Sequence, residues 1–492
     1  MNGSEKSDSA IRAMKPANNV GKPMAEWAEQ RAGTKGNAGQ PHTRRTQSRD
    51  SVSQGLDRVR QAARQRKKDK FTALLHHVTI DLLRNAFLAL KRRAAPGVDG
   101  VTWQDYEVSL EGNLQDLHDR VHRGAYRALP VRRRFIPKPG TDKQRPLGIA
   151  ALEDKVVQRA LVAVLNAIYE EDFLGFSYGF RPGRGQHDAM DALAVAICDT
   201  PVNWILDADI RSFFDSVSQE WLVRFLEHRV GDERVIRLVR KWLKAGVLDE
   251  GAWSVSEEGT PQGAVISPLL ANVYLHYVFD LWAHQWRRRE AKGNVVVVRY
   301  ADDIVVGFEH EADARLFWDA MRLRFVQFGL ELHGEKTRLL EFGRDAAARR
   351  KKRGLGRPET FTFLGFTFIC GTSRRGAFQL QRCSRRDRMR AKLREVKDRL
   401  RRRMHWSIPE QGRWLRAVVK GYLAYHAVPT NSRAISAFRY HVAVIWYRTL
   451  RRRSQTRGLL GTRMSQIADD WLPQPHILHP WPSTRFAVNH PR

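Results

Sequence analysis

Aspartates at the ends of two apolar segments are the residues of this chain whose types and spacing could do chemistry. The stretch VVVVRYADDIVVGF, residues 295–308, holds Asp302 and Asp303 side by side between two strings of apolar residues. A second apolar stretch, WILDADIRSFFD, ends in Asp207, Asp209 and Asp215. Carboxylates in apolar surroundings are costly unless each finds a partner or a cation. Strand-end carboxylates that converge from distant parts of the chain would suit Mg²⁺, which prefers oxygen ligands.

The chemistry of such a site would be phosphoryl transfer. Two metal ions roughly 4 Å apart would activate an attacking oxygen and stabilise the leaving one. Because side chains alternate along a strand, Asp207 and Asp209 point the same way, and periodicity does not choose between them. The alternative is an Asp-Asp turn capped by backbone amides and wetted by solvent, since aspartate is a common turn residue. A P-loop NTPase is disfavoured, because no GxxxxGK[ST] loop occurs in the sequence.

The elements that must position these carboxylates alternate between strands and helices from residue 101 to about residue 368. Short β-rich runs occur at NWILDADI, NVVVVRY, DIVVGF and TFTFLGFTFI, and longer runs with helical apolar spacing lie between them. This order predicts an α+β fold in which an antiparallel sheet is covered by helices on one face. The Asp302–Asp303 pair is expected at the tight turn between two of the strands.

Composition changes along the chain and predicts four regions. The N-terminal segment is polar and rich in Gly, Ser, Asn and Arg, with helical periodicity only from about Gly55, so a disordered basic arm is expected. Beyond about residue 375 the chain is basic and helical in pattern, and its last segment contains several prolines, which argue against a long terminal helix. The predicted regions are the arm at 1–55, a mixed domain at 56–375, a helical domain at 376–455 and a short basic tail at 456–492.

Charge and cysteine content narrow the classes of partner and setting. The 492 residues include 85 Lys and Arg against 53 Asp and Glu, a net charge of +32. Such an excess favours a polyanion, above all nucleic acid, because neutralised phosphates release counterions. The alternative is a ribosomal-type or membrane-surface protein. Apolar runs are far shorter than the ~18 residues of a membrane span, and three isolated cysteines indicate neither disulfides nor a zinc site. A reducing, cytoplasmic setting is expected.

Several motifs, in a fixed order, resemble those of reverse transcriptases. RYADDIVV resembles the family's Tyr-Xaa-Asp-Asp turn, ADIRSFFD its first palm motif, and EEGTPQGAVISPLLANVYLH the palm motif that follows. IPKPGTDKQRPLGIAALEDKVVQ resembles the fingers, and FGLELHGEKTRLLEFG and TFTFLGFTF resemble the last two palm motifs. One tetrapeptide alone would be weak, but the ordered set across about 96–368 is highly specific. The resemblance implies a right-hand polymerase fold of fingers and palm, followed by an all-helical thumb.

Two further regions narrow the resemblance to bacterial group II intron-encoded reverse transcriptase/maturases. AAPGVDGVTWQDY matches their N-terminal block, and RWLRAVVKGYLAYHAVPTN with LRRRSQ resembles their thumb, also called the X domain. The similarity covers roughly residues 70–485. No cysteine pair or HNH-like spacing follows residue 455, so the DNA endonuclease of many relatives is expected to be absent. Any DNA-binding segment in the tail would be a reduced one.

The resemblance implies an RNA-directed DNA polymerase that copies intron RNA during retrohoming and assists intron splicing as a maturase. The cofactor would be two Mg²⁺ ions, for which Mn²⁺ could substitute. The partners would be group II intron RNA, a DNA primer or target and dNTPs, with no membrane, in a bacterial cytoplasm near the nucleoid; a homodimer is one assembly to consider. The alternatives are a related enzyme recruited to a CRISPR-associated or defence role, and an RNA-binding maturase without polymerase activity.

The resemblance also implies roles for single residues of the catalytic centre. Asp209, Asp302 and Asp303 match the family's catalytic, metal-binding carboxylates, and the carbonyl oxygen of Ile210 would be a further ligand. Asp207 and Asp215 do not match the motif and are expected at the surface or behind the site. The aromatic residue that excludes a ribose 2′-hydroxyl would be Phe214.

Residues that would contact the incoming nucleotide follow from the same motifs. Lys138 and Arg145 match fingers residues that grip the triphosphate, since Arg can fork two phosphate oxygens and Lys supplies a point charge. The alternative is an ordinary solvated basic loop. Gln262 would lie against the sugar or base pair. Lys336 matches a lysine near the pyrophosphate that would act as a general acid, and a helix-capping lysine is the alternative.

Contacts to primer, template and intron RNA complete the expected set. Tyr300 would pack near the primer end, Gly263 would permit a close backbone approach, and Arg181 and Arg184 would contact template phosphates. Arg299 has no assigned role.

The thumb would supply the remaining RNA contacts. Tyr422, Tyr425 and Trp446 could stack on RNA bases or belong to a core, and helical spacing favours core for at least one of the tyrosines. Arg451 and Arg452 would belong to a solvated, phosphate-facing surface.

Overall fold

The apolar runs that carry the aspartates are neighbouring strands of one antiparallel sheet, which we call the palm sheet. The computed structural model describes residues 43–137, 144–249, 252–254, 258–260, 263–453 and 460–489. The strand order of the palm sheet is β6(Val295–Tyr300), β7(Asp303–Phe308), β3(Trp204–Asp209) and β8(Arg338–Glu341). The predicted α+β class with an antiparallel sheet is therefore confirmed.

Helices lie on both faces of the palm sheet, whereas the sequence predicted one covered face. α12(Glu311–Gln327) packs on one face, where the rings of Phe308 and Phe317 lie 5.3 Å apart. α6(Gln186–Asp199) covers the other face along β6, and its first side chain bonds to that of Tyr300. The difference follows from the run of four valines in β6, which point alternately to the two faces and are all buried.

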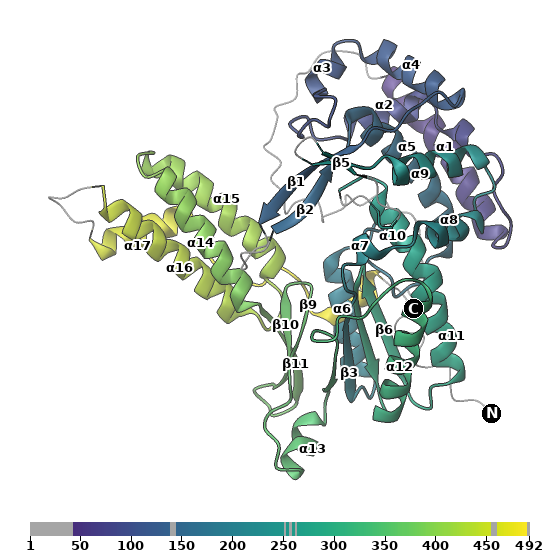
Figure 1. Ribbon diagram of the computed structural model, residues 1–492. Helices are drawn as coiled ribbons and strands as arrows, with labels where there is room; N and C mark the ends of the chain where they lie inside the picture. Colours follow the sequence, from purple (N-terminus) through teal and green to yellow (C-terminus); the bar gives the residue numbers. More distant parts are fainter. Residues whose placement is uncertain are drawn as a thin grey trace.

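A helical region with its own small sheet lies beyond the carboxylate end of the palm sheet (Figure 1, top). We call it the fingers. The strand order of its sheet is β2-β1-β4-β5, and β1 and β2 form an antiparallel hairpin. The strands are β1(Val131–Pro137), β2(Gln144–Ile149), β4(Val247–Asp249) and β5(Ala252–Ser254). The helices are α1(Thr43–Gln65), η2(Leu75–His77), α2(Ile80–Leu88), α3(Trp103–Glu107), α4(Leu110–His122), α5(Leu152–Asp172), α8(Gln219–Glu227) and α9(Glu233–Lys244).

The first helix corrects the predicted boundary of the N-terminal arm. α1 begins at Thr43 rather than near Gly55, so the last part of the segment expected to be disordered is helical. Val59 and Ala63 of α1 are buried, and the helix packs along α5. Once a helix is anchored by packing, extending it costs little, even through polar residues. The rest of the predicted arm, residues 1–42, lies outside the described residues.

Further helices connect the strands of the palm, and one of them changes its winding. α10 continues without a break into a π-helical turn, η3, and then into α11. A π-turn inside an α-helix is rare and rotates the side chains that follow it. These palm helices are α7(Phe213–Ser216), α10(Ser267–Leu275), η3(His276–Asp280), α11(Leu281–Arg289) and α13(Ala346–Lys352).

A third sheet joins the palm to the C-terminal helices. Its strands are β9(Phe361–Phe363), β10(Phe366–Thr372) and β11(Phe378–Ser384), in the order β11-β10-β9. The boundary predicted at residue 375 falls in the β10–β11 hairpin, and the helical region begins only at Arg386. The sequence FQLQRCS of β11 mixes polar with apolar residues, which hid the strand.

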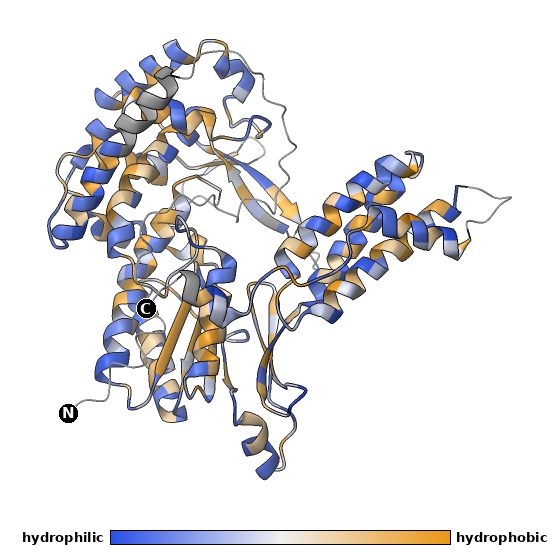
Figure 2. Ribbon diagram, turned by 180° about the vertical axis from the view of Figure 1, so that it is seen from behind, coloured by the Kyte–Doolittle hydropathy of each residue, from blue (hydrophilic) through white to orange (hydrophobic). Residues whose placement is uncertain are grey.

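Four helices after β11 form the thumb, which stands away from the palm (Figure 1). They are α14(Arg386–Arg402), α15(Ile408–His426), α16(Ser432–Arg451) and α17(Gly461–Trp471). Their apolar side chains form a hydrophobic core of their own, which includes Leu400, Leu415, Val442 and Trp446. Figure 2 shows apolar residues concentrated on the palm strands and on the inward faces of helices, while hydrophilic residues cover much of the thumb.

The tail after α17 returns to the palm. Its last helix, α18(Pro482–Asn489), packs against α6. Arg485 of α18 bonds to Asp188 at 3.0 Å, and its guanidinium lies 3.6 Å from Asp191. Arg382 of β11 bonds to the other oxygen of Asp191 at 2.6 Å. The DNA-binding role expected for this segment stays a prediction, but its basic residue Arg485 is engaged inside the molecule.

Within the described ranges, no helix combines the length and the apolar character that crossing a bilayer requires.

Candidate active site

Three carboxylates gather at one end of the palm sheet. The register of β3 and β7 places Asp209 directly opposite Asp303, and Asp302 lies in the turn between β6 and β7. Paired residues on neighbouring strands lie about 5 Å apart, so residues far apart in sequence become neighbours. Asp207 lies further back on β3, where its carboxylate is 3.8 Å from the guanidinium of Arg338. The structure thus separates the two candidates that strand alternation left equivalent.

The carboxylates strongly influence one another's protonation. The pKa of Asp303 is raised to about 7, first by the surrounding protein and then by Asp302, Asp209 and Asp207, while Arg388 of the thumb acts in the opposite direction. The side chain of Asp303 is open to solvent, so the carboxylate lies among many protein atoms without being sealed from water. Burial also raises the pKa of Asp207 to about 6. Negative charge therefore accumulates here beyond what the nearby cations balance.

The donor chemistry of this cluster fits a hard divalent cation. Among the residues that the structure describes, no three Asp, Glu, His or Cys side chains are already arranged as metal ligands. The available donors are nevertheless all oxygens, and a cation would relieve the mutual repulsion that raises the pKa of Asp303. Lys336 now supplies one positive charge, with its Nζ 2.7 Å from Oδ2 of Asp209. Ile210 follows at the end of β3 and is bridged to Leu332.

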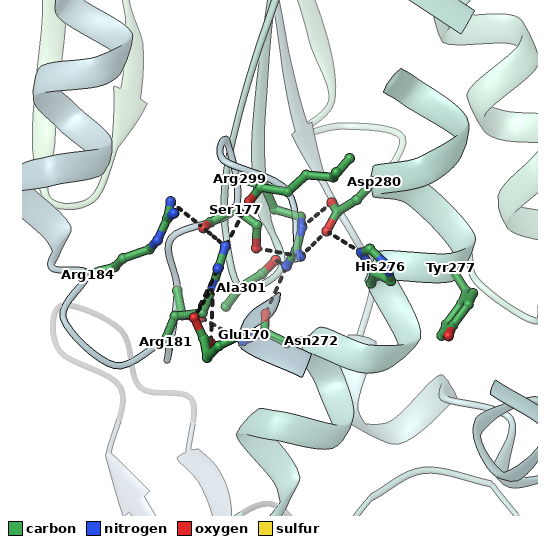
Figure 3. A network of polar contacts seen from close by, with 12 residues as sticks. Glu170, Ser177, Arg181, Arg184, Asn272, His276, Tyr277, Asp280, Arg299 and Ala301 are labelled. Carbon is green, nitrogen blue, oxygen red and sulfur yellow. Dashed lines mark hydrogen bonds and ion pairs between the residues drawn. The ribbon is translucent and has the colours of Figure 1, made fainter. Parts of the chain in front are cut away.

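The turn that carries Asp302 is supported by a loop from a distant part of the chain. Ala301 adopts a left-handed conformation with φ +56°, which is uncommon for a residue other than glycine. Gly179 packs directly against it, since a Cβ atom on Gly179 would lie 2.2 Å from the Ala301 nitrogen. Sequence reasoning missed Gly179, and it left Arg299 without a role. Arg299 is fully buried beneath the same turn (Figure 3).

A cavity of about 160 Å³ lies against the fingers sheet, next to the segment that follows β3. Phe214 lines it, together with Pro146 and Gly148 of β2 and with Thr260. Phe214 forms an aromatic wall of this cavity and is only partly buried. Its role in excluding a 2′-hydroxyl stays a prediction.

The glycine of the Pro-Gln-Gly turn makes its close approach to the fingers. Gly263 has φ +106°, and a Cβ atom there would lie 2.4 Å from the carbonyl oxygen of Gly148. Arg145 lies in β2 opposite Ile136. Lys138 and Gln262 fall outside the described residues.

Tyr300 lies beside the carboxylates, opposite Asp303 in the β6–β7 register. Its ring is half-buried, and the ring centroid lies 6.3 Å from that of Phe180. Burial raises the pKa of its hydroxyl. The expected contact with a primer stays a prediction.

The predicted template contact of Arg181 is wrong, because its side chain is buried, whereas that of Arg184, which is partly exposed, stays a prediction. The Arg181 side chain is 2% exposed and forms an ion pair with Glu170 at 3.0 Å. It also donates to the carbonyl of Ser177, and Arg184 donates to the carbonyl of Gly175 at 2.6 Å. Burial, followed by the charge of Arg181, lowers the pKa of Arg184 to about 10. Both arginines satisfy loop carbonyls that would otherwise be buried without a donor.

The thumb aromatics are mainly structural. Tyr422 is 8% exposed and its ring stacks on Phe438 at 3.6 Å, so of its two predicted roles the structure supports the core position and not RNA stacking. Trp446 is fully buried in the thumb core. The Tyr425 hydroxyl donates to the carbonyl of Leu364 at 2.7 Å, which joins the thumb to the β9–β10 turn.

Two basic residues at the end of α16 remain accessible. Arg451 and Arg452 are both exposed, and the Arg451 guanidinium lies over the Tyr447 ring. Their expected contact with RNA stays a prediction.

Comparison with known proteins shows what the central part of the chain is similar to. Residues 136–368 match the family model for reverse transcriptase (RNA-dependent DNA polymerase). Protein YkfC of Escherichia coli is 37% identical over 248 residues, which cover 44% of this chain and 65% of the relative. The group II intron-encoded protein LtrA of Lactococcus lactis is 31% identical over 222 residues, 45% of this chain and 37% of the relative. An uncharacterized 91 kDa protein in the cob intron of Schizosaccharomyces pombe is 39% identical over 198 residues, 39% of this chain and 24% of the relative.

The chain therefore spans less than two thirds of each of these curated relatives. The segment that matches the reverse transcriptase family model, residues 136–368, holds all three carboxylates of the cluster.

Proposed function

We propose that this chain is an RNA-directed DNA polymerase encoded by a group II intron, which extends a DNA 3′-hydroxyl on an RNA template using dNTPs. The observation that carries the proposal is the register of β3 against β7, which sets Asp209 opposite Asp303 and beside Asp302. The family of residues 136–368 supports the same reaction. Gly263, Gly148 of β2 and Phe214 would then lie near the incoming nucleotide.

The three carboxylates would hold two Mg²⁺ ions, or Mn²⁺ in their place. When bound, such ions activate the attacking 3′-oxygen and stabilise the negative charge on the leaving pyrophosphate. The carboxylates contribute fixed oxygen ligands at the rigid end of a sheet, since catalysis of phosphoryl transfer depends mostly on positioning and charge stabilisation.

Lys336 would act on the leaving group. Its side chain is 59% exposed and its Nζ already lies beside Asp209, so it can reach a phosphate oxygen without a change in the backbone. In the proposed reaction Lys336 gives a proton to the leaving pyrophosphate oxygen. Lys138 and Arg145 of the fingers would neutralise the triphosphate, Gln262 would lie against the sugar or base pair, and Phe214 would bar a 2′-hydroxyl.

The basic thumb would bind folded intron RNA and so assist its splicing. Phosphate neutralisation supplies most of the affinity in such an interface. α14 presents a dense row of exposed basic side chains, and the similarity to the group II intron-encoded protein LtrA supports this second role. The exposed basic residues of α14 are Arg386, Arg388, Arg390, Arg394, Lys397, Arg399, Arg401 and Arg402.

The test is Mg²⁺-dependent incorporation of dTTP on poly(rA)/oligo(dT). The wild-type protein should extend the primer, and the double substitution Asp302→Ala with Asp303→Ala should abolish extension. RNA binding and splicing assistance should persist in the double variant, because the thumb is untouched. Extension that survives the double substitution would show that the carboxylates are wrongly assigned. A wild-type protein that binds RNA but never extends a primer would point to a maturase without polymerase activity.

A further inference from the structure

Arg299 precedes the carboxylate turn and is fully buried, although the sequence suggests no role for it. Its guanidinium makes five hydrogen bonds to four residues, through three side chains and one backbone carbonyl (Figure 3). Nε donates to Oδ1 of Asp280 at 2.7 Å, and Nη2 donates to Oδ2 of Asp280 at 2.5 Å and to the Ser177 hydroxyl at 2.7 Å. Nη1 donates to Oδ1 of Asn272 and to the carbonyl of Ala301, both at 3.0 Å. The five N–H groups of an arginine are thereby all used.

One of these acceptors belongs to the turn itself. The carbonyl of Ala301 is the peptide oxygen immediately before Asp302, and Ala301 holds a strained left-handed conformation. Such a conformation costs on the order of 1–3 kcal/mol and persists only where the surroundings hold it. Arg299 binds the turn from below, and Gly179 packs against it from the side.

The other acceptors connect the turn to the palm helices. Asn272 of α10 accepts from Arg299 and donates to the carbonyl of Gly179 at 2.7 Å. Asp280 stands at the end of the π-turn η3, which brings its carboxylate to the arginine. α10 begins shortly after Gly263. One buried network therefore joins α10 and η3 to the carboxylate turn.

Stability alone does not account for this network, because burying an ion pair costs free energy. Both side chains of the Arg299–Asp280 pair are 0% exposed, and such a pair loses the hydration of both charges. Well-packed apolar residues often stabilise a core equally well or better. Burial lowers the pKa of the neighbouring His276 to about 4, so at neutral pH this imidazole adds no charge. Apolar residues could not replace the directional hydrogen bonds of Arg299. One of these bonds holds the carbonyl of Ala301 in the turn.

We propose that Arg299 is a positioning residue that fixes the Ala301–Asp302 peptide and thereby aims the carboxylates of Asp302 and Asp303. This inference rests on the proposed polymerase function. Lysine in its place would keep the positive charge, but its three donors on one nitrogen cannot fork Asp280 and reach Ala301 together. The turn would then lose its support while the carboxylates remain.

The test compares Arg299→Lys with a matched control, Arg229→Lys. Arg229 also forms a buried pair with an aspartate, Asp172, at 2.8 Å, with side chains 4% and 12% exposed. It lies in the fingers, where it also donates to backbone carbonyls near the end of α1. Both substitutions should lower the melting temperature. Only Arg299→Lys should weaken Mn²⁺ binding in isothermal titration by roughly 10- to 100-fold, as loss of a supporting bond around metal ligands does.

Activity gives a second readout, measured well below the melting temperatures. Arg299→Lys should raise the Mg²⁺ concentration for half-maximal extension and lower kcat, with the KM for dTTP nearly unchanged. Equal effects of the two substitutions on Mn²⁺ binding and kcat would overturn the inference. If Arg299→Lys fails to fold, Ser177→Ala removes a single bond of the network and should shift Mn²⁺ binding in the same direction by a smaller factor; unchanged binding there would also overturn it.

The outcome for the wild-type protein separates this inference from the proposed function. A wild-type chain that never extends a primer would contradict the proposed polymerase function. An active wild-type chain whose Arg299→Lys variant behaves like Arg229→Lys contradicts only the positioning role.

Discussion

The ammonium of Lys336 lies 2.7 Å from Oδ2 of Asp209, although 127 residues separate the two in sequence. The pair brings a mobile positive charge to one end of the carboxylate cluster, where the proposed reaction needs both a proton and a countercharge. The ion pair with Asp209, and not burial, holds the Lys336 side chain at the site.

Replacing Lys336 should slow the chemical step. Lys336→Ala should lower kcat by about 10²–10⁴-fold, the usual contribution of a general acid, with a smaller change in primer binding. Lys336→Arg keeps the charge but cannot release a proton. Single-turnover incorporation of dTTP measures both. Full activity of the arginine variant would leave Lys336 as a countercharge only.

Gly263→Ala should disturb the contact between the Pro-Gln-Gly turn and the fingers. The added methyl group would meet the carbonyl of Gly148, so the turn or β2 must shift. We expect the kcat/KM for dTTP to fall at least about 10-fold, since small misplacements of reacting groups are costly, while RNA binding stays unchanged.

Gly100→Ala is the matched control for that substitution. Gly100 also has a positive φ, +71°, but a Cβ atom there would meet nothing within 4 Å. It should lose roughly 1 kcal/mol of stability for the backbone conformation alone, with normal activity. Equal activity of the two variants would contradict the close-approach argument.

The junction between the thumb and the palm should weaken in acid through His426. Burial lowers the pKa of His426 to about 4, below its value of ~6.5 in the unfolded chain. A histidine with a lowered pKa stabilises the folded state above about pH 6.5, and this contribution is lost as the pH falls towards 4. The melting temperature of wild type minus that of His426→Gln should therefore shrink between pH 7.5 and pH 5. A difference that stays constant with pH would contradict the role of His426.

Arg485→Ala should loosen the return of the tail to the palm. It removes the bonds to Asp188 and Asp191, so limited proteolysis should cut the chain faster between the thumb and α18. Single-nucleotide addition should be unchanged, while long products on an RNA template become rarer. The control is Arg322→Ala, whose ion pair at 3.5 Å is exposed on α12. Equal product lengths for the two variants would contradict the idea that the tail holds the thumb against the palm.

The sequence predicted the parts of the site that depend on local pattern and on motifs. Apolar strings on both sides of Asp302 and Asp303 indicated a turn between strands, and the structure has it there. Choosing Asp209 over Asp207 required the resemblance, because both point to the same face. The register that pairs Asp209 with Asp303 is a tertiary property.

The errors concern charged residues whose environment is set by distant segments. Arg181 looked like a surface cation, but buried loop carbonyls claim its donors. Arg299 had no assignment because its partners Asp280 and Ser177 lie 19 and 122 residues away. The sequence held one local hint, because Arg299 directly follows a run of four valines. In a strand that is buried on both faces, a side chain at this position has little access to water. The path of the tail was equally hidden, since prolines end a helix without indicating where the chain goes next.

Asp191 accepts a bond from Arg382, where the chain enters the thumb, and lies against Arg485, where the chain has left it. The thumb is thus attached to α6 at both of its ends, in the manner of an inserted domain. A single carboxylate therefore serves both crossings between palm and thumb, and loss of Asp191 would weaken the two attachments at once.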